Sequence, residues 1–341
     1  MENNHIKDGF NYGLAILRSL MCFEVLLNHF WVPLKKQSFW LFEKLLPVAV
    51  PVFMILSFYL MGRHFLNYSI QEVKARLWRI YYPQIGWGGV YFLFYIIYDY
   101  IFGEKYVELS DLFFQITLGH SINQSMWYQF VLLVITIIFY GIFRTCSEKK
   151  SICILVILSI ISLVSQYLGI GYYLFSSLRM ELSYPLGRLI EVFPYATIGF
   201  LLYYFNVFKK IINFFGGIYL PVICFSCILV VLLVTNIFPT EVGFGYSGLD
   251  YIFTAFCIVI IFYLLNGFAK NAIYKNIVVI ATKYTLGIYC MHRLVGNVFV
   301  ILFDMLHIPV DGFTFCIFIY ICCYFIASIM AKIFFLRKLV E

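Results

Sequence analysis

The chain alternates between long apolar segments and short polar breaks along its whole length. A helix that spans a membrane needs about 20 mostly apolar residues, and about ten segments reach that length. The breaks are too short to hold a soluble domain. We therefore predict one domain over residues 1–341, an all-α bundle of about ten transmembrane helices with no appended soluble domain. The predicted spans begin near Leu14, Leu46, Pro83, Met126, Ile152, Glu191, Phe215, Leu249, Ile277 and Phe313.

Composition and charge support this class and suggest an orientation. Hydrophobic residues make up 63% of the chain, charged residues only 12%, and the mean hydropathy is +0.92, which excludes a soluble globular protein. Placing both termini in the cytoplasm puts about two thirds of the lysines and arginines on the cytoplasmic side. The net charge of +7 then reflects a basic inner face. We expect a multi-pass protein of the cell (plasma or inner) membrane, with lipid rather than nucleic acid as its partner.

The first span, "LRSLMCFEVLLNHF", contains three ionisable residues, Arg18, Glu24 and His29. In an α-helix, Arg18 and His29 are three turns plus about 20° apart and about 16 Å apart along the axis. We therefore expect both side chains to face one cavity, with Glu24 on a different face. Ionisable groups at membrane depth usually face a cavity or a partner. The alternative is that Arg18 reaches the inner headgroups while His29 meets the outer ones. Glu24 has no predicted role beyond pairing with another helix.

A second basic pair precedes the third span in "EVKARLWRIYYPQIGW". Arg76 and Arg79 are three residues apart, so they share one helical face, just inside the membrane where the span is expected to begin at Pro83. Two guanidinium groups in this position can bind a phosphate through paired hydrogen bonds. Anchoring to lipid phosphates is the alternative for this pair.

In this order, the motifs resemble those of the membrane-bound acyltransferase family 3. The family's first span carries Arg, ten residues and then His; its second carries Pro-x-Phe-x-x-x-Ser-Gly; and an RxxR precedes its third. Less specific matches lie in "MWYQF", "FPYATIGFLL" and "LGIYCMHRLV". One departure is Phe58, which stands where the family usually has glycine and leaves the local helix packing open. The matching residues are Arg18 and His29; Pro51, Phe53 and Ser57; Arg76, Arg79 and Pro83; Trp127 and Tyr128; Pro194 and Gly199; Tyr289 and His292.

This resemblance implies an O-acetyltransferase. Members of the family move an acetyl group from cytosolic acetyl-CoA to a hydroxyl of a cell-surface polysaccharide or its lipid-linked precursor. On this basis Arg76 and Arg79 would bind acetyl-CoA. His29 would be the general base, a task suited to a group with a pKa near neutrality, and Arg18 would steady the donor or stabilise developing negative charge. Possible substrate-site residues are Trp127, Tyr128 and His292.

The resemblance leaves several partners and features open. No metal is expected. The partners would be the lipid bilayer and a carbohydrate acceptor, with a homo-oligomer or a polysaccharide-synthesis complex as further options. His120 and His292 should lie near the outer boundary, where polar anchoring is the alternative to catalysis. The aromatic segment "YYLFSSLRMELSY" could bind sugar or form an interfacial belt.

Two other functions remain possible from the sequence. A transporter or flippase of a lipid-linked sugar or polysaccharide would use Arg18 and His29 to line a path across the membrane. Such proteins commonly have paired repeats and broken helices, and neither is visible in the sequence. The other possibility is an inactive structural partner in polysaccharide synthesis. The sequence does not name the acyl acceptor, separate acetyl from other acyl groups, or give the side on which the acceptor is modified.

Overall fold

A computed structural model describes the chain over twelve ranges: 10–31, 48–66, 69–103, 107–123, 125–168, 170, 175, 177–215, 226, 249–266, 271–309 and 311–340. Within these ranges the regular structure is entirely helical. Eight helices are long and apolar enough to cross a membrane, which confirms the all-α, multi-pass class. They are α1 with the π turn that follows it (Tyr12–Leu26 and Leu27–Trp31), α4 (Ala49–Leu66), α5 (Ile70–Phe102), α7 (Trp127–Thr145), α8 (Glu148–Tyr167), α10 (Met180–Tyr204), α15 (Thr285–Met305) and α16 (Gly312–Met330).

The remaining predicted spans differ in detail. Helix α13 (Leu249–Leu265) is apolar but has only 17 residues, and most of the span expected from Phe215 lies outside the described residues. Helix α5 begins at Ile70, well before Pro83, because the Ser69 hydroxyl caps its first turn by accepting a hydrogen bond from the Glu72 amide at 3.2 Å. A serine followed by glutamate three residues later is a helix-start signal. The count of ten spans and the cytoplasmic placement of the termini stay predictions.

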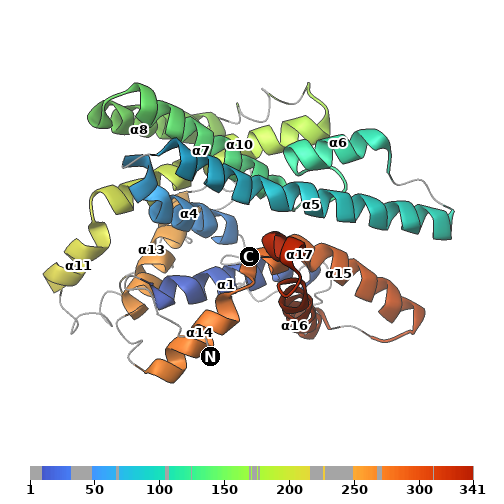
Figure 1. The fold of residues 1–341 in the computed structure, drawn as a ribbon. Helices are drawn as coiled ribbons and strands as arrows, with labels where there is room; N and C mark the ends of the chain where they lie inside the picture. Colours follow the sequence, from blue (N-terminus) through green and yellow to red (C-terminus); the bar gives the residue numbers. More distant parts are fainter. Residues whose placement is uncertain are drawn as a thin grey trace.

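Helix α4 lies between two groups of helices (Figure 1). Helices α5, α7, α8 and α10 form one group together with the short α6 (Leu109–Leu118), and α1, α13, α15 and α16 form the other with α14 (Ala272–Thr282). The largest apolar core runs through both groups and through α4. Residues of α1 and α4 are therefore surrounded by protein on most sides, and Glu24 of α1 is buried.

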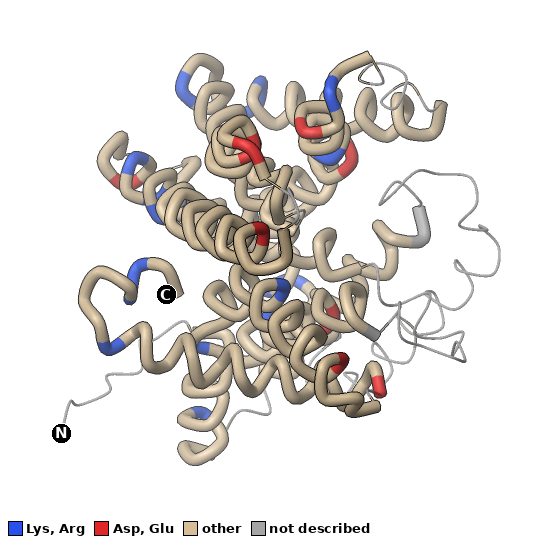
Figure 2. Tube along the Cα trace, turned by 90° about the vertical axis from the view of Figure 1, so that its right-hand side faces the viewer, with Lys and Arg blue, Asp and Glu red and all other residues tan. Residues whose placement is uncertain are grey.

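The outer surfaces of the spanning helices are apolar. Large hydrophobic side chains such as Leu93, Ile97, Ile161 and Phe325 are more than half exposed, and charged residues are sparse along the helices (Figure 2). A soluble protein rarely exposes so much contiguous apolar surface. The helices thus present to their surroundings the kind of surface that the hydrocarbon of a bilayer would cover.

Close packing of α4 against α10 depends on Gly199. A Cβ atom at this position would lie 2.2 Å from the carbonyl oxygen of Ile55, so only glycine allows the two backbones to approach this closely. Phe58, the residue that replaces the family's usual glycine, is fully buried and packs against Phe139 with ring centroids 4.6 Å apart. The close approach is therefore made by Gly199 on α10, while Phe58 fills the space between α4 and α7.

The segment predicted to form one span from Ile277 is a broken helix. Helix α14 ends at Thr282 and α15 begins at Thr285. The break lies next to α1, where Arg18 donates a hydrogen bond to the Thr282 carbonyl oxygen at 3.3 Å. A guanidinium is favourable at the C-terminal end of a helix, where carbonyl groups lack helical partners. The sequence gives no sign of this break, because the apolar composition continues across it.

The last described helix, α17 (Phe334–Val340), packs back onto the bundle. The indole Nε1 of Trp87 donates to the Leu339 carbonyl oxygen at 3.1 Å, and Gly86 leaves the space that the Leu339 side chain occupies. Val340 is fully buried beside Gly287 of α15. This helix therefore joins α5 to α15, a contact that the sequence did not indicate.

Candidate active site

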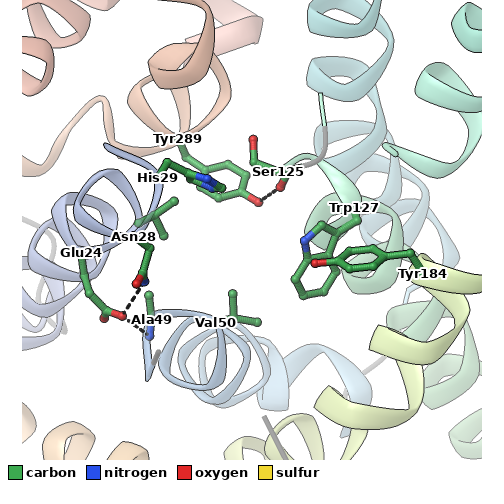
Figure 3. Close-up of a pocket in the computed structure, with 10 residues that line it drawn as sticks. Glu24, Asn28, His29, Ala49, Val50, Ser125, Trp127, Tyr184 and Tyr289 are labelled. Carbon is green, nitrogen blue, oxygen red and sulfur yellow. Dashed lines mark hydrogen bonds between the residues drawn. The ribbon is translucent and has the colours of Figure 1, made fainter. Parts of the chain in front are cut away.

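Five helices and the loop before α7 surround a cavity of about 240 Å³, which we call the His29 cavity (Figure 3). Glu24, Asn28 and His29 lie on one side of it, and Trp127 and Tyr184 lie across from them. The floor is the first turn of α4. The full lining is Glu24, Val25, Asn28, His29, Ala49, Val50, Ser125, Trp127, Tyr184 and Tyr289.

His29 stands on a π turn, Leu27–Trp31, that directly follows α1. In such a turn, a backbone N–H donates to the carbonyl oxygen five residues earlier. These turns are rare overall, and many of those known lie at functional sites. His29 is half-buried, and its ring centroid lies 5.2 Å from that of His292, with the rings inclined by 33°. The structure thus brings together two of the predicted site residues, one from each end of the chain.

His292 is completely buried in α15. Its Nδ1 atom lies 2.6 Å from the carbonyl oxygen of Tyr289. A carbonyl oxygen only accepts hydrogen bonds, so Nδ1 carries a hydrogen and Nε2 of the neutral ring carries a lone pair. That Nε2 atom is buried and has no hydrogen-bond partner in the described part of the chain. Tyr289 in turn donates its hydroxyl hydrogen to the Ser125 carbonyl, which fixes α15 to the loop before α7.

Glu24 lines the same cavity as His29, which corrects its predicted placement on a different face. The ideal α-helical projection fails here because the π turn changes the register after Leu26. One carboxyl oxygen of Glu24 accepts hydrogen bonds from the Ala49 amide at 3.2 Å and from Asn28 at 3.4 Å. Ala49 is the first residue of α4. Glu24 therefore satisfies a free N–H group at the start of a neighbouring helix.

An aromatic wall faces His29 across the cavity. Trp127 begins α7, and Tyr184 belongs to α10. The guanidinium of Arg188 lies over both rings, at 5.6 Å from the Trp127 centroid and 4.7 Å from the Tyr184 centroid, and it also pairs with Glu191. The wall is therefore held in place by a cation–π contact and an ion pair. Trp127 was predicted as a substrate-site residue; Tyr184 was only part of a segment with two possible roles.

His120 supports this wall from the loop between α6 and α7. Its ring stacks on Tyr184 with centroids 4.5 Å apart and an angle of 21°. Burial lowers the pKa of His120 from 6.5 to about 4, and the positive charges of Arg188 and Arg293 act in the same direction, against the opposing effect of Glu181. The ring is therefore neutral near pH 7. His120 is not among the residues that line the His29 cavity, so it supports the wall from behind.

Arg18 lines a second cavity of about 430 Å³ between α1, α4 and α13. The sequence predicted that Arg18 and His29 face one common cavity; the structure instead places them on two separate ones. Arg18 is an exposed residue within this second cavity, which we call the Arg18 cavity. Its other lining residues are Phe10, Asn11, Leu14, Ala15, Leu56, Tyr59, Leu60, Tyr263 and Asn266.

Arg76 of the RxxR motif lies near both Arg79 and Arg18. Arg76 interacts electrostatically with Arg79, with Arg18 and with the phenol of Tyr128. In the part of the chain that the structure describes, no acidic side chain forms an ion pair with any of the three arginines. Three guanidinium groups without a carboxylate favour an anionic ligand. We call Arg18, Arg76 and Arg79 the arginine cluster.

Tyr128 connects the arginine cluster to the His29 cavity. Its hydroxyl lies 3.3 Å from the Ser57 hydroxyl of the α4 signature, and its ring packs edge-on against Tyr289 with centroids 6.0 Å apart. Tyr289 lines the His29 cavity. The predicted residues thus form one series. It runs from Arg76, which interacts electrostatically with Tyr128, through the ring contacts of Tyr128 with Tyr289 and of Tyr289 with His292. Within the described ranges, no three His, Cys, Asp or Glu side chains gather as metal ligands.

These features define a multi-pass membrane protein with a buried imidazole site and a nearby arginine cluster. The family model described as an acyltransferase domain matches residues 11–332, nearly the whole chain. The protein therefore belongs to acyltransferase family 3 and is a membrane acyltransferase. No curated protein and no solved structure gives a significant match.

Proposed function

We propose that the protein transfers an acetyl group from cytosolic acetyl-CoA to a hydroxyl of a cell-surface polysaccharide or of its lipid-linked precursor, in the cell membrane. The observation that carries this proposal is the series of neighbouring residues that runs from Arg76 through Tyr128 and Tyr289 to the His29 cavity. It offers a place for an anionic donor at one end and for acid–base chemistry at the other. Family membership supports the reaction class.

The arginine cluster is the proposed binding site for the CoA phosphates. Arg76 and Arg79 stand on one face of α5, and Arg18 of α1 interacts electrostatically with Arg76. Paired N–H groups suit the geometry of phosphate oxygens. From there the acetyl-pantetheine arm would extend past Ser57 and Tyr128 toward Tyr289. Acetyl-CoA is a co-substrate in this scheme, and the chemistry requires no metal.

His29 is the proposed general base. It takes the proton of the acceptor hydroxyl as the oxygen attacks the thioester carbonyl carbon. A carbon–oxygen bond forms, the carbon–sulfur bond breaks, and the proton held by His29 passes to the CoA sulfur. The products are the O-acetyl ester and free CoA. The ring of His292 lies beside that of His29, and its Nε2 lone pair would help to hold the His29 ring or its proton during this transfer.

The aromatic wall supports a carbohydrate as the acyl acceptor. The rings of Trp127 and Tyr184 face the His29 side of the cavity (Figure 3), and sugars present apolar C–H faces that pack against such rings. The cavity of about 240 Å³ is smaller than the roughly 300–1,000 Å³ typical of drug-sized ligands. It would therefore hold one sugar residue of a longer chain.

A vesicle assay tests the proposal. Vesicles that contain the protein are supplied with labelled acetyl-CoA and with the crude surface polysaccharide of the host. We expect labelled polysaccharide from the wild type and at least 100-fold less from His29→Ala, consistent with the loss of a general base. His64→Ala is the matched control, because His64 is an exposed histidine outside both cavities. Equal labelling by wild type and His29→Ala, with both proteins folded, would refute the role of His29.

Transport of a lipid-linked sugar or polysaccharide is the second candidate function. The break between α14 and α15 beside Arg18 favours it, because broken helices at membrane depth often line transport sites. The two functions differ in what a deletion strain loses. Loss of O-acetyl groups with normal polymer export supports the acyltransferase, whereas loss of export supports the transporter.

A further inference from the structure

Glu24 has more bonding capacity than its structural contacts use. The residue is 6% exposed. Its Oε1 atom accepts the hydrogen bonds from the Ala49 amide and from Asn28, and the Val48 amide also lies close to the carboxyl group. The Oε2 atom is buried and has no hydrogen-bond partner among the described residues. Glu24 lines the His29 cavity, so its carboxyl group borders the space that a bound molecule would occupy.

Capping α4 does not explain why a carboxyl group is present. A neutral glutamine would present the same oxygen to the Ala49 amide. A second carboxyl oxygen that stays buried and unpaired is unfavourable, because burial removes its water without giving a hydrogen bond in return. The carboxyl group is better explained if a bound molecule supplies the missing partner for Oε2.

The position of Glu24 relative to His29 suggests what that partner is. The two residues are five positions apart, about 7.5 Å along the helix axis, and both side chains line one cavity (Figure 3). A ring-sized molecule with polar groups on two edges can reach both side chains at once. Trp127 and Tyr184 would then cover its remaining side.

We propose that Glu24 is a binding residue for the acyl acceptor, whose Oε2 atom accepts a hydrogen bond from a hydroxyl other than the one that is acylated. The proposal rests on the proposed function. His29 acts on the reacting hydroxyl, and Glu24 recognises a second hydroxyl on the same residue of the acceptor. The protein would consequently prefer polyhydroxylated acceptors to simple alcohols. The role is in binding, with no proton or acyl group transferred to Glu24.

Glu24→Gln tests this role while it preserves the helix cap. Both donors, the Ala49 amide and Asn28, require an oxygen, so the glutamine oxygen stays on them and its NH₂ group replaces Oε2 in the cavity. A hydrogen-bond acceptor is thus exchanged for a donor, which removes the hydrogen bond that Oε2 would accept from a hydroxyl. Glu148→Gln is the matched control, because Glu148 is an exposed glutamate at the start of α8.

The assay uses the polysaccharide fraction that accepts label from wild-type vesicles. We expect Glu24→Gln to raise the KM for this polysaccharide at least fivefold. The KM for acetyl-CoA and the kcat at saturation should stay within twofold of wild type, and the melting temperature in detergent should stay within 2 °C of it. An unchanged polysaccharide KM would overturn the proposal, as would a change confined to kcat. A joint change of both KM values and of the melting temperature would show that Glu24 only caps α4. If wild type labels no polysaccharide, the proposed function itself fails.

Discussion

The imidazole rings of His29 and His292 lie 5.2 Å apart although they come from opposite ends of the chain. The Tyr289 carbonyl oxygen holds Nδ1 of His292 at 2.6 Å, which leaves Nε2 as the free nitrogen of a fully buried ring. A hydrogen-bonded partner that fixes a tautomer is how many catalytic histidines are oriented. His292 therefore acts, in our interpretation, as a positioning residue for His29.

We predict that His292→Asn lowers kcat about tenfold or more and leaves the KM for acetyl-CoA within twofold. The asparagine amide can still donate to the Tyr289 carbonyl oxygen, so the local fold is kept, but it offers no lone pair where Nε2 stood. The measurement is the initial rate of labelled polysaccharide formation as a function of pH. A positioning role also shifts the acidic limb of that pH profile, because the environment of His29 changes.

His64→Asn is the control for this variant, because the side chain of His64 is about half exposed and lies near Glu72. It should leave both kcat and the pH profile unchanged. A His292→Asn protein with normal kcat and a normal profile would show that His292 only fills space.

Sequence patterns predicted the parts of the site that depend on composition and on spacing within one regular helix. The apolar segments of α7, α8 and α16 are uninterrupted, so their spans were found. Residues before the π turn, such as Arg18, were placed on the correct helix. The relation of Glu24 to His29 was mispredicted because a π turn has no clear sequence signal, and its hydrogen bonds shift the His29 side chain around the axis.

Relations between segments that are distant in sequence were not predictable in the same way. The break between α14 and α15 lies in a continuous apolar stretch, and the group that satisfies it is Arg18, far away in the chain. The division into two cavities likewise depends on how α4 packs between the helix groups. A single sequence records which residues are present, but it does not record which distant segment meets them.

The arginine cluster yields a prediction about the donor. Arg79→Ala should raise the KM for acetyl-CoA about tenfold or more, because a phosphate loses a charged hydrogen-bond donor. The same variant should leave transfer from the thioester S-acetyl-N-acetylcysteamine unchanged, since this small donor has no phosphates. The measurement is the initial rate with each donor at several concentrations.

Arg144→Ala serves as the comparison for Arg79→Ala. Arg144 is an exposed arginine in the last turn of α7, so its loss tests a general effect of positive charge. Equal sensitivity of both donors to Arg79→Ala would contradict phosphate binding and favour a structural role for this arginine.

His120 should make the protein less stable in acid. Its pKa is lowered from 6.5 to about 4 in the folded protein, chiefly by burial, so the unfolded chain binds more protons between these values. Stability is therefore lost as the pH falls through this window. Between pH 7 and pH 5 the loss attributable to His120 is about 2 kcal/mol. Melting temperatures in detergent at both pH values should fall further for wild type than for His120→Gln. An equal drop in melting temperature for the two proteins would contradict the burial of a neutral His120 ring.

Gly199 and Gly187 on the same helix should respond in opposite directions to alanine. A Cβ at Gly199 would meet the Ile55 carbonyl oxygen at 2.2 Å, whereas nothing lies within 4 Å of a Cβ at Gly187. Gly199→Ala must push α4 and α10 apart, at a cost of about 1–3 kcal/mol. Gly187→Ala gains about 0.5–1 kcal/mol from helix propensity alone. Melting temperatures in detergent should therefore fall for the first variant and stay level or rise for the second.

Because α4 also carries Ala49 and Val50 of the cavity floor, Gly199→Ala should reduce activity more than it reduces the folded fraction. Shifts of the same sign in both variants would contradict the close contact between α4 and α10.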